Sequence, residues 1–185
     1  GGVSCPGWVL PSFSVIAGAQ AACIRPSPVS NTTMTGTCTT TNPAGAGYRT
    51  GSDTGNVYNV VSSASVTGTT DGILFGRGTV FNNGAIVSSG FFGVIGINDA
   101  IVNNTGTITA NGAQGTGVGA LSFHVSNSGT ITADGADGSG VRGGQSLSDL
   151  NNTGKIRASG RNGIRGPAGG GSAIRWALEG ARGAP

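Results

Sequence analysis

Three consecutive lines of the sequence decide the fold. IVNNTGTITANGAQGTGVGALSFH begins at Ile101, VSNSGTITADGADGSGVRGGQSLSDL begins at Val125, and NNTGKIRASGRNGIRG begins at Asn151. The phrase Asn-x-Gly-x-Ile-x-Ala-x-Gly recurs in each of them. Self-similarity at a period of about 20–50 residues is the signature of a repeat architecture.

The same register extends toward the N-terminus as columns of equivalent residues. Three columns are aliphatic: Val66, Ile86, Ile108, Ile131 and Ile156; Val60, Val80, Val102, Val125 and Leu150; and Ile73, Val94, Val118, Val141 and Ile164. An asparagine column contains Asn82, Asn104, Asn127 and Asn152, and two glycine columns contain Gly84, Gly106, Gly129, Gly154 and Gly90, Gly112, Gly135, Gly160. Members of each aliphatic column are 20–25 residues apart.

These columns predict short strands that stack coil on coil. In residues 107–109 the alternation Thr-Ile-Thr places Ile108 inside and both threonines outside. One coil cannot bury its few aliphatic side chains, but coils stacked at about 4.8 Å bury each column. Glycine and asparagine allow tight turns, and stacked asparagines can hydrogen-bond along the axis. We therefore predict an all-β, right-handed parallel β-helix (β-solenoid) over residues 60–166, with about five coils of 20–25 residues.

Composition and charge narrow the classes of partner. Only 9% of the residues are charged, which argues against classical disorder despite 37 glycines in 185 residues. Seven of the ten basic residues lie from Arg142 onward, but no aromatic residue is interleaved among them before Trp176. A nucleic-acid platform needs such aromatic residues, so no nucleic-acid partner is expected.

The N-terminal segment, residues 1–22, carries no charge. Residues 8–19 are mostly apolar, and Ala19-Gln20-Ala21 is a small-x-small cleavage pattern, which together indicate the remnant of a secretory signal peptide. The alternative is an apolar strand that packs on the domain.

Residues 23–59 form the expected lead-in to the solenoid. In an oxidising compartment Cys23 and Cys38 would close a disulfide loop of about 15 residues. Cys5 would then be removed with the signal, remain a free thiol or take part in a different pairing. The cysteine spacing matches no metal site.

The C-terminal segment, residues 167–185, leaves the repeat pattern. A Gly-rich hinge follows Pro167, and SAIRWALE at residues 172–179 could form a short amphipathic helix that caps the open end of the solenoid. Equally, this segment could be the point at which a longer protein continues.

The repeat phrases resemble a known family. VSNSGTITADGADGSGVRG and NNTGKIRASGRNGIRG are similar to passenger domains of bacterial autotransporters, and so is the opening AQAAC followed by TCTTTN, so that the resemblance covers about residues 19–166. It implies a secreted or outer-membrane-associated β-helix that is exported with a C-terminal barrel. The chain has no room for that barrel, so we expect a passenger without it. The barrel would be a further partner if the gene product is larger.

Candidate functional residues are few. No catalytic site and no metal or other cofactor is predicted: the single histidine, His124, would need a serine and an acid such as Asp99 or Asp149, and no G-x-S-x-G motif is present. The acids of residues 134–137 resemble a calcium-binding turn but do not recur in neighbouring repeats. A candidate ligand edge for an acidic partner contains Arg142, Lys155, Arg157 and Arg165.

The expected function is non-enzymatic adhesion, or service as a stalk, at the bacterial cell surface. An extended face of outward Thr, Ser and Asn would contact a glycan or protein of a host or neighbouring cell. Two alternatives remain open: a carbohydrate-active β-helix enzyme, which needs acids clustered in one groove, and a structural filament formed by end-to-end association of open solenoid ends.

Overall fold

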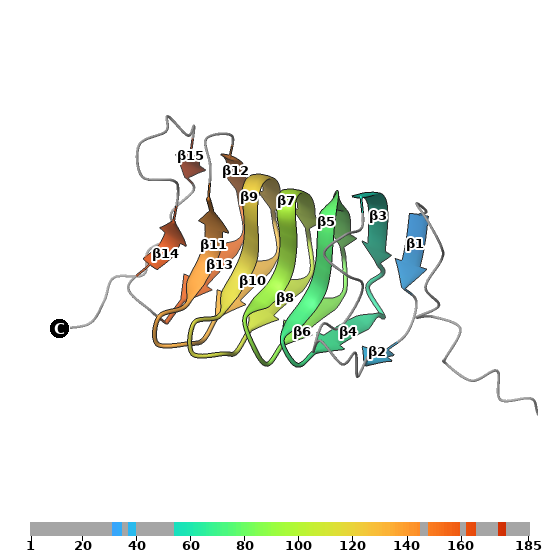
Figure 1. The fold of residues 1–185 in the computed structure, drawn as a ribbon, viewed down its shortest axis with the longest axis horizontal. Coiled ribbons are helices and arrows are strands. Elements are labelled where there is room, and N and C mark those ends of the chain that lie inside the picture. The colour runs from blue at the N-terminus through green and yellow to red at the C-terminus, as the bar shows by residue number, and fades with distance from the viewer. Residues whose placement is uncertain are drawn as a thin grey trace, which may run out of the picture.

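The computed structural model describes residues 31–34, 37–39, 54–144, 148–159, 162–165 and 174–176. Within these ranges all regular elements are β-strands, and no helix long and apolar enough to cross a membrane is found. The strands form a parallel β-solenoid, which confirms the predicted architecture (Figure 1). It has about four turns, one fewer than the sequence columns suggested.

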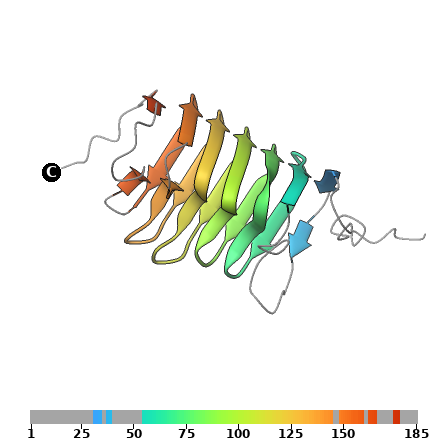
Figure 2. The same ribbon diagram turned by 45° about the horizontal axis from the view of Figure 1, so that its top comes forward.

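Two parallel sheets run the length of the stack. The nine-stranded sheet contains β1 (Asn31–Met34), β3 (Thr54–Val60), β5 (Asp71–Asn82), β7 (Phe92–Asn104), β9 (Thr116–Asn127), β11 (Ser139–Gly143), β12 (Ser148–Asn152), β14 (Asn162–Arg165) and β15 (Ile174–Trp176). The six-stranded sheet contains β2 (Thr37–Thr39), β4 (Ser65–Gly68), β6 (Ala85–Ser88), β8 (Thr107–Ala110), β10 (Thr130–Ala133) and β13 (Lys155–Ala158). Figure 2 shows the coils stacked along one axis.

The long strands β5, β7 and β9 bend, so that each serves two sides of the solenoid. The register between β5 and β7 shifts between Phe75 and Arg77, and the register between β7 and β9 shifts between Gly96 and Asp99. Such irregularities bend a strand and redirect its side chains. The bend therefore forms a corner at the same place in successive coils.

Two of the three aliphatic columns have the predicted register. Val66, Ile86, Ile108, Ile131 and Ile156 are successive Cα partners, and so are Ile73, Val94, Val118, Val141 and Ile164. Their members in the central coils are fully buried. The inner column of each sheet is thus continuous through the stack.

The start of the remaining column was predicted wrongly. Val80 pairs with Tyr58, whereas Val60 lies opposite Asn82. The cause is a longer turn: Val60 and Val66 are six positions apart, but their counterparts Asn82 and Ile86 are four apart. With the two additional residues of this turn, Val60 precedes Val66 by six residues, just as Val80 precedes Ile86. Val60 and Val80 therefore look equivalent in the sequence, although they are not strand partners.

The asparagine column is a chain of amide hydrogen bonds, of which the first two are buried and the last is partly buried. The Nδ2 of Asn82 donates to Oδ1 of Asn104 at 2.7 Å, Asn104 donates to Asn127 at 2.6 Å, and Asn127 donates to Asn152 at 2.6 Å. All three bonds run in the same direction. Because Val60 occupies the equivalent position in the preceding coil, the buried Oδ1 of Asn82 has no donor.

The glycines at residues 106, 129 and 154 explain how this turn can stack. A Cβ at Gly129 would overlap the backbone oxygen of Gly106, and a Cβ at Gly154 would overlap that of Gly129. Successive turns therefore approach more closely than any side chain permits. The backbone is further tied by Thr130 N–H, which donates to Gly106 O at 2.9 Å, and Lys155 N–H, which donates to Gly129 O at 2.8 Å.

Both ends of the solenoid differ from the predicted boundaries. β1 and β2 lie within the expected lead-in, yet they already pair with β3 and β4, and Cys38 is the Cα partner of Val66. Ile174–Trp176, expected in a helix, instead form β15, which pairs with β12. A strand satisfies the backbone groups along the edge of β12, which a helix cannot do. Residues 1–22, Cys23 and the rest of 167–185 lie outside the described residues.

The asparagine chain leads to a comparison of two substitutions. Asn104→Val removes two amide–amide bonds and leaves Oδ1 of Asn127 buried without a donor, so it should lower the free energy of unfolding by about 2–4 kcal/mol. Asn82→Val removes an acceptor that is already unpaired and leaves one new unpaired acceptor at Asn104, so its cost should be nearer about 1 kcal/mol. Urea unfolding of both variants measures the difference, and equal losses would contradict this account.

Candidate functional site

The four basic residues of the predicted ligand edge lie on two different sheets. Arg142 is exposed on β11, and its Cα partner in the next coil is Arg165 of β14, as the sequence columns predicted. Lys155 and Arg157 are exposed on β13, in the six-stranded sheet. The structure therefore divides the predicted edge into two cationic positions on separate faces.

Arg142 continues an outward row that is otherwise apolar. Leu74, Ile95, Gly119 and Arg142 are successive Cα partners across β5, β7, β9 and β11. Leu74 and Ile95 are half-buried, whereas Arg142 is exposed. The row lies directly beside the buried column that contains Val94 and Val118, so it faces outward.

The ring of Phe92 completes this row. A Cβ added at Gly119 would lie 2.6 Å from Cε1 of Phe92, so the ring rests on the backbone at the position that a side chain would otherwise fill. Ile95 flanks Gly119 on one side and Arg142 on the other. We name Leu74, Ile95, Phe92 and Arg142 the Phe92–Arg142 strip.

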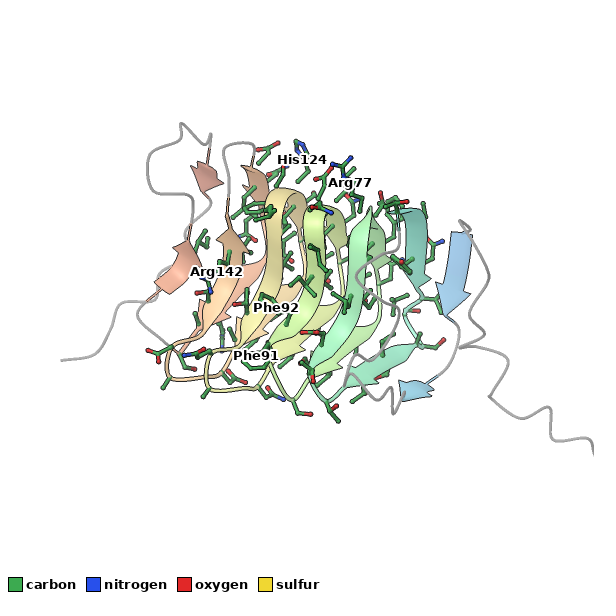
Figure 3. The ribbon with its side chains drawn as sticks, in the orientation of Figure 1. Arg77, Phe91, Phe92, His124 and Arg142 are labelled. Carbon is green, nitrogen blue, oxygen red and sulfur yellow. The ribbon has the colours of Figure 1, made fainter. Side chains whose placement is uncertain are left out.

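Further apolar side chains are exposed on the strands of the strip or next to them. Phe91 is 53% exposed, Ile97 is 45% exposed and Leu121 is 41% exposed. Figure 3 shows Phe91, Phe92 and Arg142 on one side of the ribbon, while Arg77 and His124 lie at its upper rim. This side is unlike the six-stranded sheet, where Thr107 and Thr109 stack on Thr130 and Thr132.

Sequence reasoning missed the strip because it treated outward positions as polar. The signal was present: residues 91–97 read FFGVIGI, which is apolar at both inward and outward positions instead of alternating. Placing the Phe92 ring on Gly119, however, requires the side-chain geometry.

The upper rim brings His124 and Asp149 together. They are Cα partners on β9 and β12, and Nδ1 of His124 lies 4.0 Å from Oδ2 of Asp149, with both side chains mostly exposed. Asp99, the other acid considered for His124, is instead the Cα partner of Ser122, and its buried Oδ1 has no hydrogen-bond partner. Within the described ranges no group of three or more His, Cys, Asp or Glu residues could hold a metal ion.

Asp134 and Asp137 belong to an exposed turn before β11. The N–H of Asp134 donates to Ala110 O at 3.0 Å, and the N–H of Asp137 donates to Ala113 O at 3.0 Å. These bonds stack the turn on the preceding one through the backbone.

One carboxyl group lies buried beneath the neighbouring coil. Asp71, at the start of β5, is 8% exposed, and its Oδ1 accepts a hydrogen bond of 3.2 Å from the N–H of Phe92. Burial raises the pKa of Asp71 above its ordinary value of 3.8, and the hydrogen bond from Phe92 opposes this only in part. Asp71 thus holds the backbone of Phe92 in place. The free-energy cost of burying the Asp71 carboxyl depends on whether that group is ionised.

This carboxyl predicts a pH-dependent stability difference. Because the folded-state pKa is raised, Asp71 favours folding fully below about pH 3.8 and loses that contribution as pH rises through its folded-state pKa. Asp71→Asn keeps an oxygen that can accept from Phe92 but cannot ionise. At about pH 8 the variant should have a higher melting temperature than the wild type. The difference between the two melting temperatures should shrink toward about pH 3.

Thermal unfolding across this pH range measures the effect. Asp134→Asn, which removes an exposed carboxyl, is the matched control for the loss of one negative charge. A stabilisation by Asp71→Asn that is constant with pH would contradict the assignment.

Comparisons with models of protein families, with curated proteins and with solved structures found no match to this chain. What its residues and geometry establish is an architecture, a parallel β-solenoid of about four turns.

Proposed function

We propose that the chain is a non-enzymatic passenger of the autotransporter type, secreted or held at the bacterial cell surface, that acts in adhesion or as a stalk. The observation that supports this most is the in-register stacking of equivalent residues. Ile86, Ile108 and Ile131 follow one another in consecutive coils, and Asn104 and Asn127 do the same. Such a stack makes an elongated body with fixed outward positions.

The axial contacts suit a surface element that must keep its shape. Coils are joined by the parallel strand ladders, by the buried amide chain and by glycine turns that leave no space between coils. Rotating one coil against the next would break all three at once. A ligand bound across several coils would therefore meet a surface already in its final arrangement, which reduces the entropy lost on binding.

The partner in this proposal is a glycan or protein on a host or neighbouring cell, and the exporting barrel is a second partner if the gene product is larger. Self-association is a second candidate. The six-stranded sheet ends on β2 and β13, and the structure describes no further strand beyond either of them. An edge strand can pair with another chain, so a head-to-tail filament would use these two strands.

Adhesion by the full chain tests this proposal. Beads coated with the folded chain should bind cells in excess of beads coated with the heat-unfolded chain, because presentation depends on the stacked coils. Incubation with polysaccharides should release no new reducing ends, and light scattering should give one molar mass at every concentration.

Each readout can contradict a part of the proposal. Equal retention of folded and unfolded beads would overturn adhesion by the solenoid. New reducing ends would favour the carbohydrate-active enzyme, and a mass that rises with concentration would favour the filament.

A further inference from the structure

We propose that the Phe92–Arg142 strip is the ligand-binding site and that its ligand is an acidic saccharide chain. The phenyl rings of Phe91 and Phe92 would stack on the apolar C–H face of a sugar ring, and Arg142 would pair with its carboxylate or sulfate. This inference rests on the proposed adhesive function and identifies the face that carries it.

The aromatic part of the site is held in place by the backbone. The Phe92 ring lies on Gly119, which has no side chain to lift it from the sheet, and the N–H of Phe92 is bonded to the carboxyl of Asp71. Phe91, the preceding residue, is 53% exposed, and its backbone N–H donates to Thr70 O at 2.6 Å. Two adjacent rings on a fixed backbone offer apolar area at a low cost in conformational entropy.

The charged part of the site lies one strand from that ring. Arg142 is the Cα partner of Gly119, so the two backbones are about 4.8 Å apart. The side chain of Arg142 is exposed, and Arg165 follows at the same register position in the next coil. A guanidinium group presents a planar fork of donors that matches a carboxylate or sulfate in two-point contact.

Asp71, Asp99, Asp134 and Asp137 lie on or next to the strands of the strip and bear on where an acidic group of the ligand would lie. Asp71 is buried, whereas Asp134 and Asp137 are exposed in the turn that precedes β11. Arg142 lies five residues beyond Asp137, on the strand β11 that follows the turn. The acidic group of the ligand would therefore lie over Arg142, away from that turn.

An acidic sugar fits this combination better than a lipid or a peptide. The strip crosses neighbouring strands along the axis of the solenoid. Its apolar side chains are Leu74, Ile95 and Phe92, and its one cation is Arg142. A repeating sugar chain combines an apolar ring face with an acid in the same unit, so it can meet both parts of the row at once. A lipid surface would favour several cations beside the apolar area, whereas the strip has one, Arg142, at its end.

Binding of the full chain to polygalacturonate and to dextran sulfate, with neutral dextran as the uncharged control, tests this assignment by calorimetry. We expect binding to at least one of the two acidic polymers and none to dextran. Arg142→Gln and Phe91→Ala should each weaken binding roughly tenfold. Both residues are exposed, so the variants should melt as the wild type does.

Matched controls lie on the other faces. Arg157→Gln removes an exposed arginine from the six-stranded sheet, and Phe81→Ala removes a phenylalanine that is 42% exposed on β5. Both should leave the affinity unchanged. Equal losses for Arg142→Gln and Arg157→Gln would show diffuse charge attraction and overturn the site.

Other outcomes also overturn the inference. These are absence of binding to both acidic polymers, retention on anionic lipid vesicles that the two test variants abolish, and a dimer that Phe91→Ala dissociates. Cell adhesion separates this inference from the broader function. If both test variants still adhere to cells, the strip is not the cause of adhesion. If the wild-type chain does not adhere, the proposed function itself is wrong.

Discussion

The structure depends on one constraint: each residue of a coil lies one strand spacing from its equivalent in the next coil. At about 4.8 Å, a position must hold a side chain that packs against the side chain at the same position of the next coil. Branched aliphatic residues satisfy this inside, as Ile86, Ile108 and Ile131 do. Asparagine satisfies it with a hydrogen bond, and glycine satisfies it by having no side chain. These three solutions account for the unusual composition.

This constraint is also why so much of the fold could be predicted. Whatever must repeat in space also repeats in the sequence, so Asn104, Asn127 and Asn152 appear as a column before any coordinates are known. Prediction failed where the chain leaves the repeat. The extra residues between Val60 and Val66 shifted one register without disturbing the spacing, because a sequence column records only the sum of turn and strand lengths.

The candidate site was less predictable than the fold. The pairing of Arg142 with Arg165 followed from their column, but the separation of Lys155 and Arg157 onto the other sheet depends on where the chain turns. The ring of Phe92 lies over a glycine in the following coil, a contact between residues of different columns. Column analysis compares equivalent positions only and therefore cannot detect such diagonal contacts. The strip proposed as a binding site includes one such contact, between Phe92 and Gly119.

The amide chain also gives the solenoid a direction. Every side-chain amide from Asn82 to Asn127 points its N–H toward the C-terminal coils, so the bond dipoles add along the axis, and each bond polarises the next. The N-terminal end of the column is the unpaired Oδ1 of Asn82, which is buried against the preceding coil at Val60. Two such stacks brought together with matching ends would place like dipoles against each other. The stacking of one coil on the next is therefore directional within this column.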